Sequence, residues 1–297
     1  MKDKVLHGQL TMRMKAFYEE YFEKAPENRF EHFLPAGVEA FPVLLDALDN
    51  DVADSEVRTD ALIAIGRLFE ECGPTSDSLD AVVKHAKKLS QTGFTSERQA
   101  ALFALGASRA QTLIDSFLPL LESGKGSAVN VASYVVGYAK WETAIPALVN
   151  LAKERNSETL QAVAWALGQI GNKEAIDALL DLLQDEAGVE AAVDGLSNVG
   201  SLRAIEPLTG LLVHDSLAIR LGAVHGIRSA VVEHKESILE GDFKWLHAPL
   251  REACHDEASP VAVFAMLTLA ELGQKLDPEV AYRVFNVQGK SVQKTSH

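Results

Sequence analysis

A pair of amphipathic helical segments recurs along the chain, and this recurrence restricts the fold more than any other feature. The unit is clearest in residues 158–186, where apolar residues recur at helical spacing on both sides of the short turn Gly171–Glu174. Such a helix pair cannot bury its apolar face alone, so each pair must stack against its neighbours. The sequence therefore predicts an all-α protein built as an α-solenoid, that is, a stack of two-helix repeats.

A small residue marks the same position in the first helix of successive units, where it lets two helix backbones approach closely. The positions are Gly66, Gly106, Gly137, Gly168, Ser197, Gly226 and Ala270, with spacings between 29 and 44 residues. We expect about eight units, placed at 1–52, 53–92, 93–125, 126–156, 157–186, 187–215, 216–257 and 258–287. They would form a single domain, 1–287, capped by 1–52, with its aromatic residues from Phe17 to Phe33, and by 258–287, and followed by a disordered tail, 288–297.

Three segments carry a resemblance to a known family: VRTDALIAIG (57–66), AVAWALGQIGNKEAIDALLDLL (162–183) and AIRLGAVHGI (218–227). They resemble HEAT repeats, and most closely the short bacterial branch called phycobilisome-lyase HEAT-like repeats. The resemblance covers nearly the whole chain and implies HEAT-like two-helix repeats. It also implies a possible role in attaching a bilin to a phycobiliprotein or removing one. The shared residues are packing residues, so the resemblance specifies the fold more closely than the function.

The chain is acidic, with a formal net charge of −14. Nucleic-acid binding normally requires a basic face that displaces counterions from phosphates, so the composition argues against that function class. The acidity favours solubility first and a protein partner with a basic surface second. Charged or polar residues interrupt every apolar stretch, so no membrane span is expected. The N-terminal residues lack the apolar core of a secretory signal, and we expect a cytoplasmic protein.

No motif for catalysis or cofactor binding is recognisable. The sequence lacks a G-x-S-x-G nucleophile motif, a phosphate-binding loop and a C-x-x-C pair. Two histidine–aspartate pairs, His214-Asp215 and His255-Asp256, fall at the ends of successive units. Repetition at unit ends favours capping over metal binding, because no metal-ligand spacing accompanies the pairs. We therefore predict no catalytic, metal or cofactor residues.

Acidic residues align along the second helices of the units. One column contains Asp115, Asp177 and Glu206, and the neighbouring column contains Asp181. We expect the second helices to line a concave surface, with Ile176, Leu179 and Leu183 turned to the core. The acidic strip is then either a merely solvated face or a recognition groove for a basic partner.

Trp141 stands in the turn between two helices, where the next unit has Asn172. An exposed turn tryptophan would be a candidate anchor for a partner protein. The alternative is that the ring folds back as local packing. The candidate protein-binding residues are thus Asp115, Trp141, Asp177, Asp181 and Glu206.

These observations favour a non-catalytic protein-binding scaffold or adaptor. Two alternatives remain: a bilin-lyase-like or chaperone-like factor that acts on a phycobiliprotein, and an acidic immunity protein that binds a basic toxin.

Overall fold

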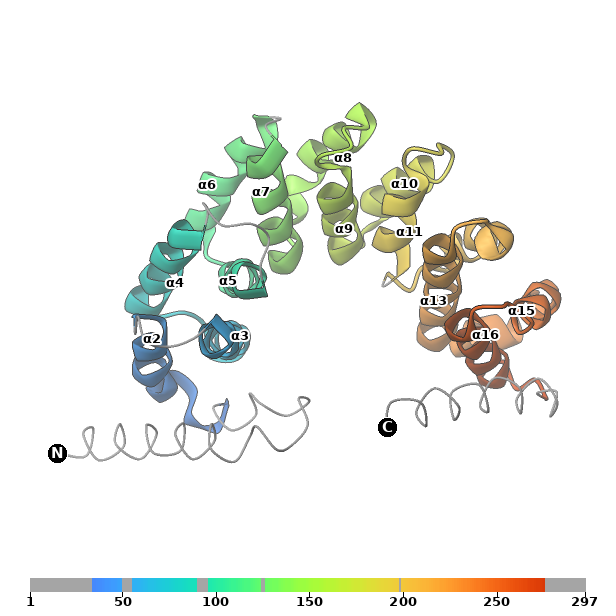
Figure 1. Ribbon diagram of the computed structural model, residues 1–297, viewed down its shortest axis with the longest axis horizontal. Coiled ribbons are helices and arrows are strands. Elements are labelled where there is room, and N and C mark those ends of the chain that lie inside the picture. The colour runs from blue at the N-terminus through green and yellow to red at the C-terminus, as the bar shows by residue number, and fades with distance from the viewer. Residues whose placement is uncertain (1–33, 50–54, 90–95, 124–125, 198, 276–297) are drawn as a thin grey trace, which may run out of the picture. The chain divides into compact units, whose positions relative to one another are not determined.

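The structure, a computed structural model, describes residues 34–49, 55–89, 96–123, 126–197 and 199–275. Within these residues every regular element is a helix, and the predicted all-α solenoid fold is confirmed. Figure 1 shows the helix pairs following one another along the chain. The aromatic residues expected in the N-terminal cap, from Phe17 to Phe33, and the tail 288–297 lie outside the described residues.

The chain divides into two compact units. Unit 1 comprises residues 1–123 and 134–140, and unit 2 comprises residues 124–133 and 141–297. The expectation of one continuous domain over residues 1–287 stays a prediction, and each unit is described by itself.

Unit 1 contains two complete helix pairs. Its elements are η2 (Leu34–Ala40), α2 (Phe41–Asp49), α3 (Ser55–Cys72), α4 (Ser76–Leu89), α5 (Ser96–Ala107), α6 (Gln111–Glu122) and the second half of α7 (Gly126–Ala139). The first helices α3 and α5 pack against each other along much of their length. They can do so because Gly66 faces the Phe103 ring, and a Cβ at Gly66 would also lie 3.2 Å from the Ala104 backbone.

A buried polar cluster connects the two helix pairs of unit 1. Arg58 on α3 donates from Nε to Glu97 Oε1 on α5 at 2.6 Å, and Ser55 Oγ donates to Glu97 Oε2 at 2.8 Å. His85 Nε2 on α4 lies 2.7 Å from Glu97 Oε1. Burial alone would raise the pKa of Glu97, but the hydrogen bonds to Arg58, His85 and Ser55 outweigh it and lower that pKa to about 2.

Among the described residues, unit 2 contains the first half of α7 and the helices that follow it. These are η3 (Glu142–Ala144), α8 (Ile145–Glu154), α9 (Leu160–Ile170), α10 (Lys173–Leu182), α11 (Val189–Ser197), η4 (Leu202–Ala204), α12 (Ile205–Gly210), η5 (Leu211–Val213), α13 (Leu217–Glu233), α14 (Lys235–Glu240), η6 (Lys244–Leu246), α15 (His247–Ala253) and α16 (Ser259–Glu271). The helix pairs α7/α8, α9/α10 and α11/α12 fall inside the expected ranges 126–156, 157–186 and 187–215.

The first and second helices of unit 2 form two rows. The first helices α9, α11, α13 and α16 lie on the inner side of the bend in this unit, whereas α8, α10 and α15 lie on its outer side (Figure 1). The concave placement expected for the second helices is therefore not observed in unit 2. The first helices pack against one another more extensively than the second helices do, which accounts for the direction of the bend.

Glycine makes this close packing of the first helices possible. A Cβ added to Gly168 on α9 would collide with the backbone carbonyl of Gly195 on α11. Around this contact the core is well filled, since Leu167 and Leu179 are both 0% exposed. Ile176 and Leu179 on α10 are buried as expected, whereas at the end of the helix Leu182 is buried and the expected Leu183 is only half-buried.

Within unit 2, the ends of four repeats share one capping interaction. At each, a side-chain acceptor receives the backbone N–H two residues further on, at 2.8 to 3.1 Å; the acceptors are Asn156, Asp185, His214 and Asp256. Capping was predicted for both histidine–aspartate pairs. The first pair uses its histidine and the second uses its aspartate, so His214 corresponds to Asp256 rather than to His255.

Residues 234–247 make the repeat 216–257 longer than its neighbours, and the sequence predicts that they lengthen the loop before its second helix. They instead fold into α14 and η6. Ile238 and Leu246 from this segment are buried, and they attach it to the core. Trp245 is 43% exposed.

The glycine contact can be tested with a matched pair of alanine substitutions. Gly168→Ala should lower the free energy of unfolding by about 1–3 kcal/mol, because the added Cβ overpacks a backbone contact. Gly210 has a helical φ of −62° and nothing within 4 Å of an added Cβ. Gly210→Ala should therefore leave stability unchanged or raise it by up to about 1 kcal/mol. Equal effects in denaturant unfolding would contradict the packing argument.

The buried cluster predicts an acid-dependent loss of stability. The folded pKa of Glu97, about 2, lies below its ordinary value of 4.5, so its contribution is fully present above pH 4.5 and is lost as pH falls towards 2. Glu97→Gln should lower the free energy of unfolding by about 3 kcal/mol at pH 6. The gap between parent and variant should shrink to about half by pH 3. Urea unfolding at both pH values measures it, and a gap independent of pH would rule out this assignment.

Candidate functional site

A groove lies between the neighbouring second helices α8 and α10 of unit 2. Its volume is about 680 Å³, which falls within the range of ligand-binding pockets. The groove exists because the second helices lie on the outer side of the bend, where they are less closely packed than the first helices.

The floor of this α8/α10 groove is apolar. Ile145, Pro146, Val149, Ala152 and Ala178 line it. Ile145 and Ala152 are buried, Val149 and Ala178 are half-buried, and Pro146 is exposed. Apolar side chains that remain partly accessible in a concave surface can gain contact area with a bound chain.

Charged residues surround this floor. The lining includes the carboxylates Glu142, Glu174, Asp177 and Asp181 and the basic side chains Lys153 and Arg155, together with the amide of Asn150. Carboxylates outnumber basic groups, so the groove favours a basic over an acidic occupant.

The two central aspartates are held in ion pairs between repeats. Asp177 on α10 pairs with Arg203 of η4. Asp181 Oδ2 lies 3.3 Å from Nη2 of Arg155, whose Nε lies 2.9 Å from Asp185 Oδ2. Hydrogen bonds from the Ala187 N–H and from Arg155 lower the pKa of Asp185 below its ordinary value. Basic side chains from adjacent repeats therefore offset part of the negative charge that the sequence places on α10.

The structure brings only two of the five candidate residues together. Asp177 and Asp181 share one exposed side of α10 in the groove. Glu206 is exposed on α12 but does not line the groove, and Asp115 is exposed on α6 in unit 1.

Trp141 occupies the turn position expected for it, directly before η3. Its ring is 8% exposed, so the structure agrees with the local-packing alternative and does not present Trp141 as a surface anchor. Trp141 is therefore left out of the proposed binding surface.

Sequence reasoning missed the apolar floor and the arginines. Pro146 and Asn150 occupy the same two columns as the acidic residues, and Val149 lies between them on α8. That departure from the acidic pattern was a visible signal of a mixed surface. Arg155 gave no such signal, because its partners Asp181 and Asp185 lie 26 and 30 residues away.

The groove has the features of a binding surface and none that assign chemistry. Among the described residues, no group of three or more His, Cys, Asp or Glu side chains is placed to hold a metal ion. In the described part of the chain, no helix combines the length and the apolar character needed to cross a bilayer.

Comparisons with known proteins give a family match over part of the chain and structural matches of low similarity. No curated protein matches the chain. Among solved structures, an engineered protein is 20% identical over 89% of this chain and 75% of its own, with a TM-score of 0.40. A computationally designed armadillo repeat protein for modular peptide recognition is 17% identical over 78% of this chain and 99% of its own, with a TM-score of 0.37. Residues 86–191 match the family described as HEAT repeats, and both helices of the α8/α10 groove lie inside this span.

Proposed function

We propose that this chain is a non-catalytic protein-binding scaffold and that the α8/α10 groove holds a segment of its partner. The observation that carries the proposal is the groove itself, an open concavity of about 680 Å³ with an apolar floor inside a charged rim. Repeat proteins stack small units into extended surfaces, and they commonly bind their partners on such surfaces.

The charge of the rim favours a segment that contains basic residues. Glu142 and Glu174 line the groove and have no ion pair with a basic side chain among the described residues, whereas Asp177 and Asp181 do. A lysine or arginine of the partner would meet Glu142 and Glu174 first. Such charges at a rim mainly raise the association rate, while apolar contact with Val149 and Pro146 slows dissociation.

The test is affinity capture with a groove variant and a matched control. Val149→Asp places a charge on the apolar floor and should weaken binding of a captured partner at least about tenfold. Val232→Asp makes the same change at an exposed residue of α13 outside the groove, and it should bind like the parent. Circular dichroism must show equal helicity and melting temperature for all three proteins.

Affinity is then measured at two salt concentrations for the partner that the parent retains. Binding should weaken as salt screens the rim charges. A partner that binds Val149→Asp as tightly as the parent does would show that this groove is not the site.

The identity of the captured partner also separates the two alternatives raised by the sequence. A phycobiliprotein, with visible bilin absorbance in the complex, would favour the lyase-like or chaperone-like role. A basic toxin would favour the immunity role.

A further inference from the structure

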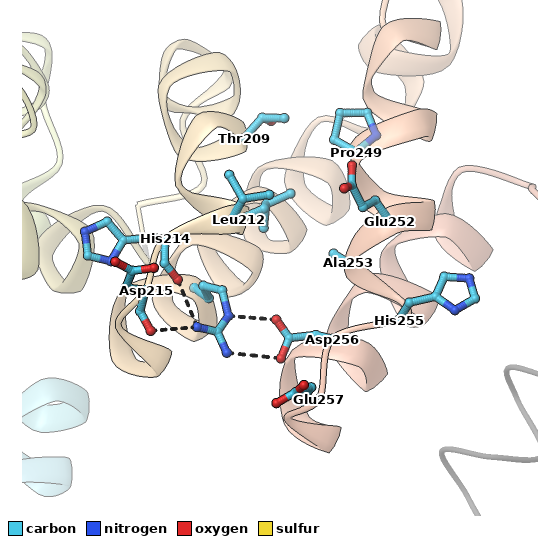
Figure 2. Close-up of a pocket in the computed structure, with 12 residues that line it drawn as sticks. Thr209, Leu212, His214, Asp215, Pro249, Glu252, Ala253, His255, Asp256 and Glu257 are labelled. Atoms are coloured by element: carbon cyan, nitrogen blue, oxygen red, sulfur yellow. Dashed lines mark hydrogen bonds and ion pairs between the residues drawn. The ribbon is translucent and has the colours of Figure 1, made fainter.

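A second cavity of unit 2 lies between η5 and α15 and has a volume of about 450 Å³. We call it the η5/α15 pocket, and Figure 2 shows residues that line it. It shares no lining residue with the α8/α10 groove.

An ion pair closes one end of this pocket. Arg220 on α13 donates from Nε to Asp256 Oδ2 at 2.7 Å and from Nη2 to Asp256 Oδ1 at 3.2 Å (Figure 2). Its Nη1 donates to the backbone carbonyls of His214 and Asp215 at 2.8 and 2.9 Å. All three guanidinium nitrogens of Arg220 are thus engaged within the protein.

Part of the pocket lining is apolar. It includes Leu212 and Val213 of η5 and Pro249 and Ala253 of α15. Val213 is 72% exposed, which is a high value for an aliphatic side chain in a concave surface. Figure 2 shows the Glu252 carboxylate near Pro249, on the side of α15 that faces Leu212.

The negative charge at this pocket is not offset. Asp215, Glu252 and Glu257 line it, all three are exposed, and none forms an ion pair with a basic side chain among the described residues. The hydrogen bond to Asp256 raises the pKa of Arg220, and the charges of Glu257 and Asp215 raise it further. The carboxylates of Glu257 and Asp215 therefore interact electrostatically with Arg220, although Arg220 directs its hydrogen bonds to Asp256 and to backbone carbonyls.

The two histidines at the pocket do not supply the missing positive charge to its interior. Nδ1 of His214 accepts the backbone N–H of Ser216 at 3.0 Å. In Figure 2 the rings of His214 and His255 lie on opposite sides of the Asp256 carboxylate, and His255 points away from Leu212.

We propose that the η5/α15 pocket binds a lysine or arginine side chain from an extended segment of a protein partner. The aliphatic stem packs between Val213 and Pro249, and the cationic head lies among the carboxylates of Glu252, Glu257 and Asp215. Long basic side chains combine these two properties, an apolar stem and a charged end. This proposal rests on the proposed function only in assuming that the occupant is a protein. The residues that line the η5/α15 pocket differ from those that line the α8/α10 groove.

The test uses a peptide pair that differs by one charge. The probes are two capped hexapeptides with a central arginine or a central citrulline, which has a similar shape without the charge. Methyl NMR on the full chain follows Val213 for this pocket and Val149 for the groove. The arginine peptide should shift the Val213 methyl signals saturably, with an affinity at least about tenfold higher than that of the citrulline peptide.

Two variants make the assignment specific. Replacing both Glu252 and Glu257 by Gln should reduce the affinity of the arginine peptide about tenfold or more. Glu240→Gln removes one exposed carboxylate on α14, outside the pocket, and should leave the affinity within about twofold of the parent.

The outcomes separate this proposal from the α8/α10 groove. Shifts at Val213 without shifts at Val149 would support the pocket whether or not the groove is a site. Shifts at Val149 alone, equal shifts at Val213 with both peptides, or unchanged affinity in the Glu252/Glu257 double variant would each overturn the pocket proposal.

Discussion

The close approach of the first helices is the constraint on which the rest of unit 2 depends. Gly168 on α9 lies against the backbone of Gly195 on α11, and no side chain fits between them. Strong packing in this row brings the first helices together on the inner side of the bend. The second helices are correspondingly less tightly packed, and both the α8/α10 groove and the η5/α15 pocket lie between members of that outer row. The groove and the pocket thus form in the outer row because the first helices, in the inner row, pack more closely.

Polar contacts hold successive repeats in register and also decide the surface charge. Arg155 reaches Asp181 and Asp185 of the next repeat, and Arg220 on α13 reaches Asp256 at the end of its own repeat. The partly exposed pairs of Arg155 add little to stability, so their main effect on function is electrostatic. The ion pairs with Arg155 and Arg203 offset the negative charge of Asp181 and Asp177 on α10. At the η5/α15 pocket, Asp215, Glu252 and Glu257 form no ion pair among the described residues.

The two concavities therefore differ in character although the same architecture produces both. The α8/α10 groove has a longer apolar floor and partly offset charge, which suits apolar contact along a chain segment. The η5/α15 pocket is smaller and more acidic, which suits a single basic side chain. Unit 1 uses a comparable polar link internally: Glu97 is buried with Arg58 and His85, so this carboxylate stabilises the helix pairs and is not available to a partner.

The sequence alone determined the helix pairs, their approximate boundaries and the exposure of Asp115, Asp177, Asp181 and Glu206, because helical periodicity and turn residues are local signals. It also indicated capping by the His214-Asp215 and His255-Asp256 pairs at the unit ends, although not which residue of each pair forms the cap. Only the tertiary structure decided that Trp141 is buried, that Arg203 pairs with Asp177, and that the second helices of unit 2 lie on the outer side of its bend. These features depend on the angle and distance at which one helix pair packs on the next, and a repeat period specifies neither.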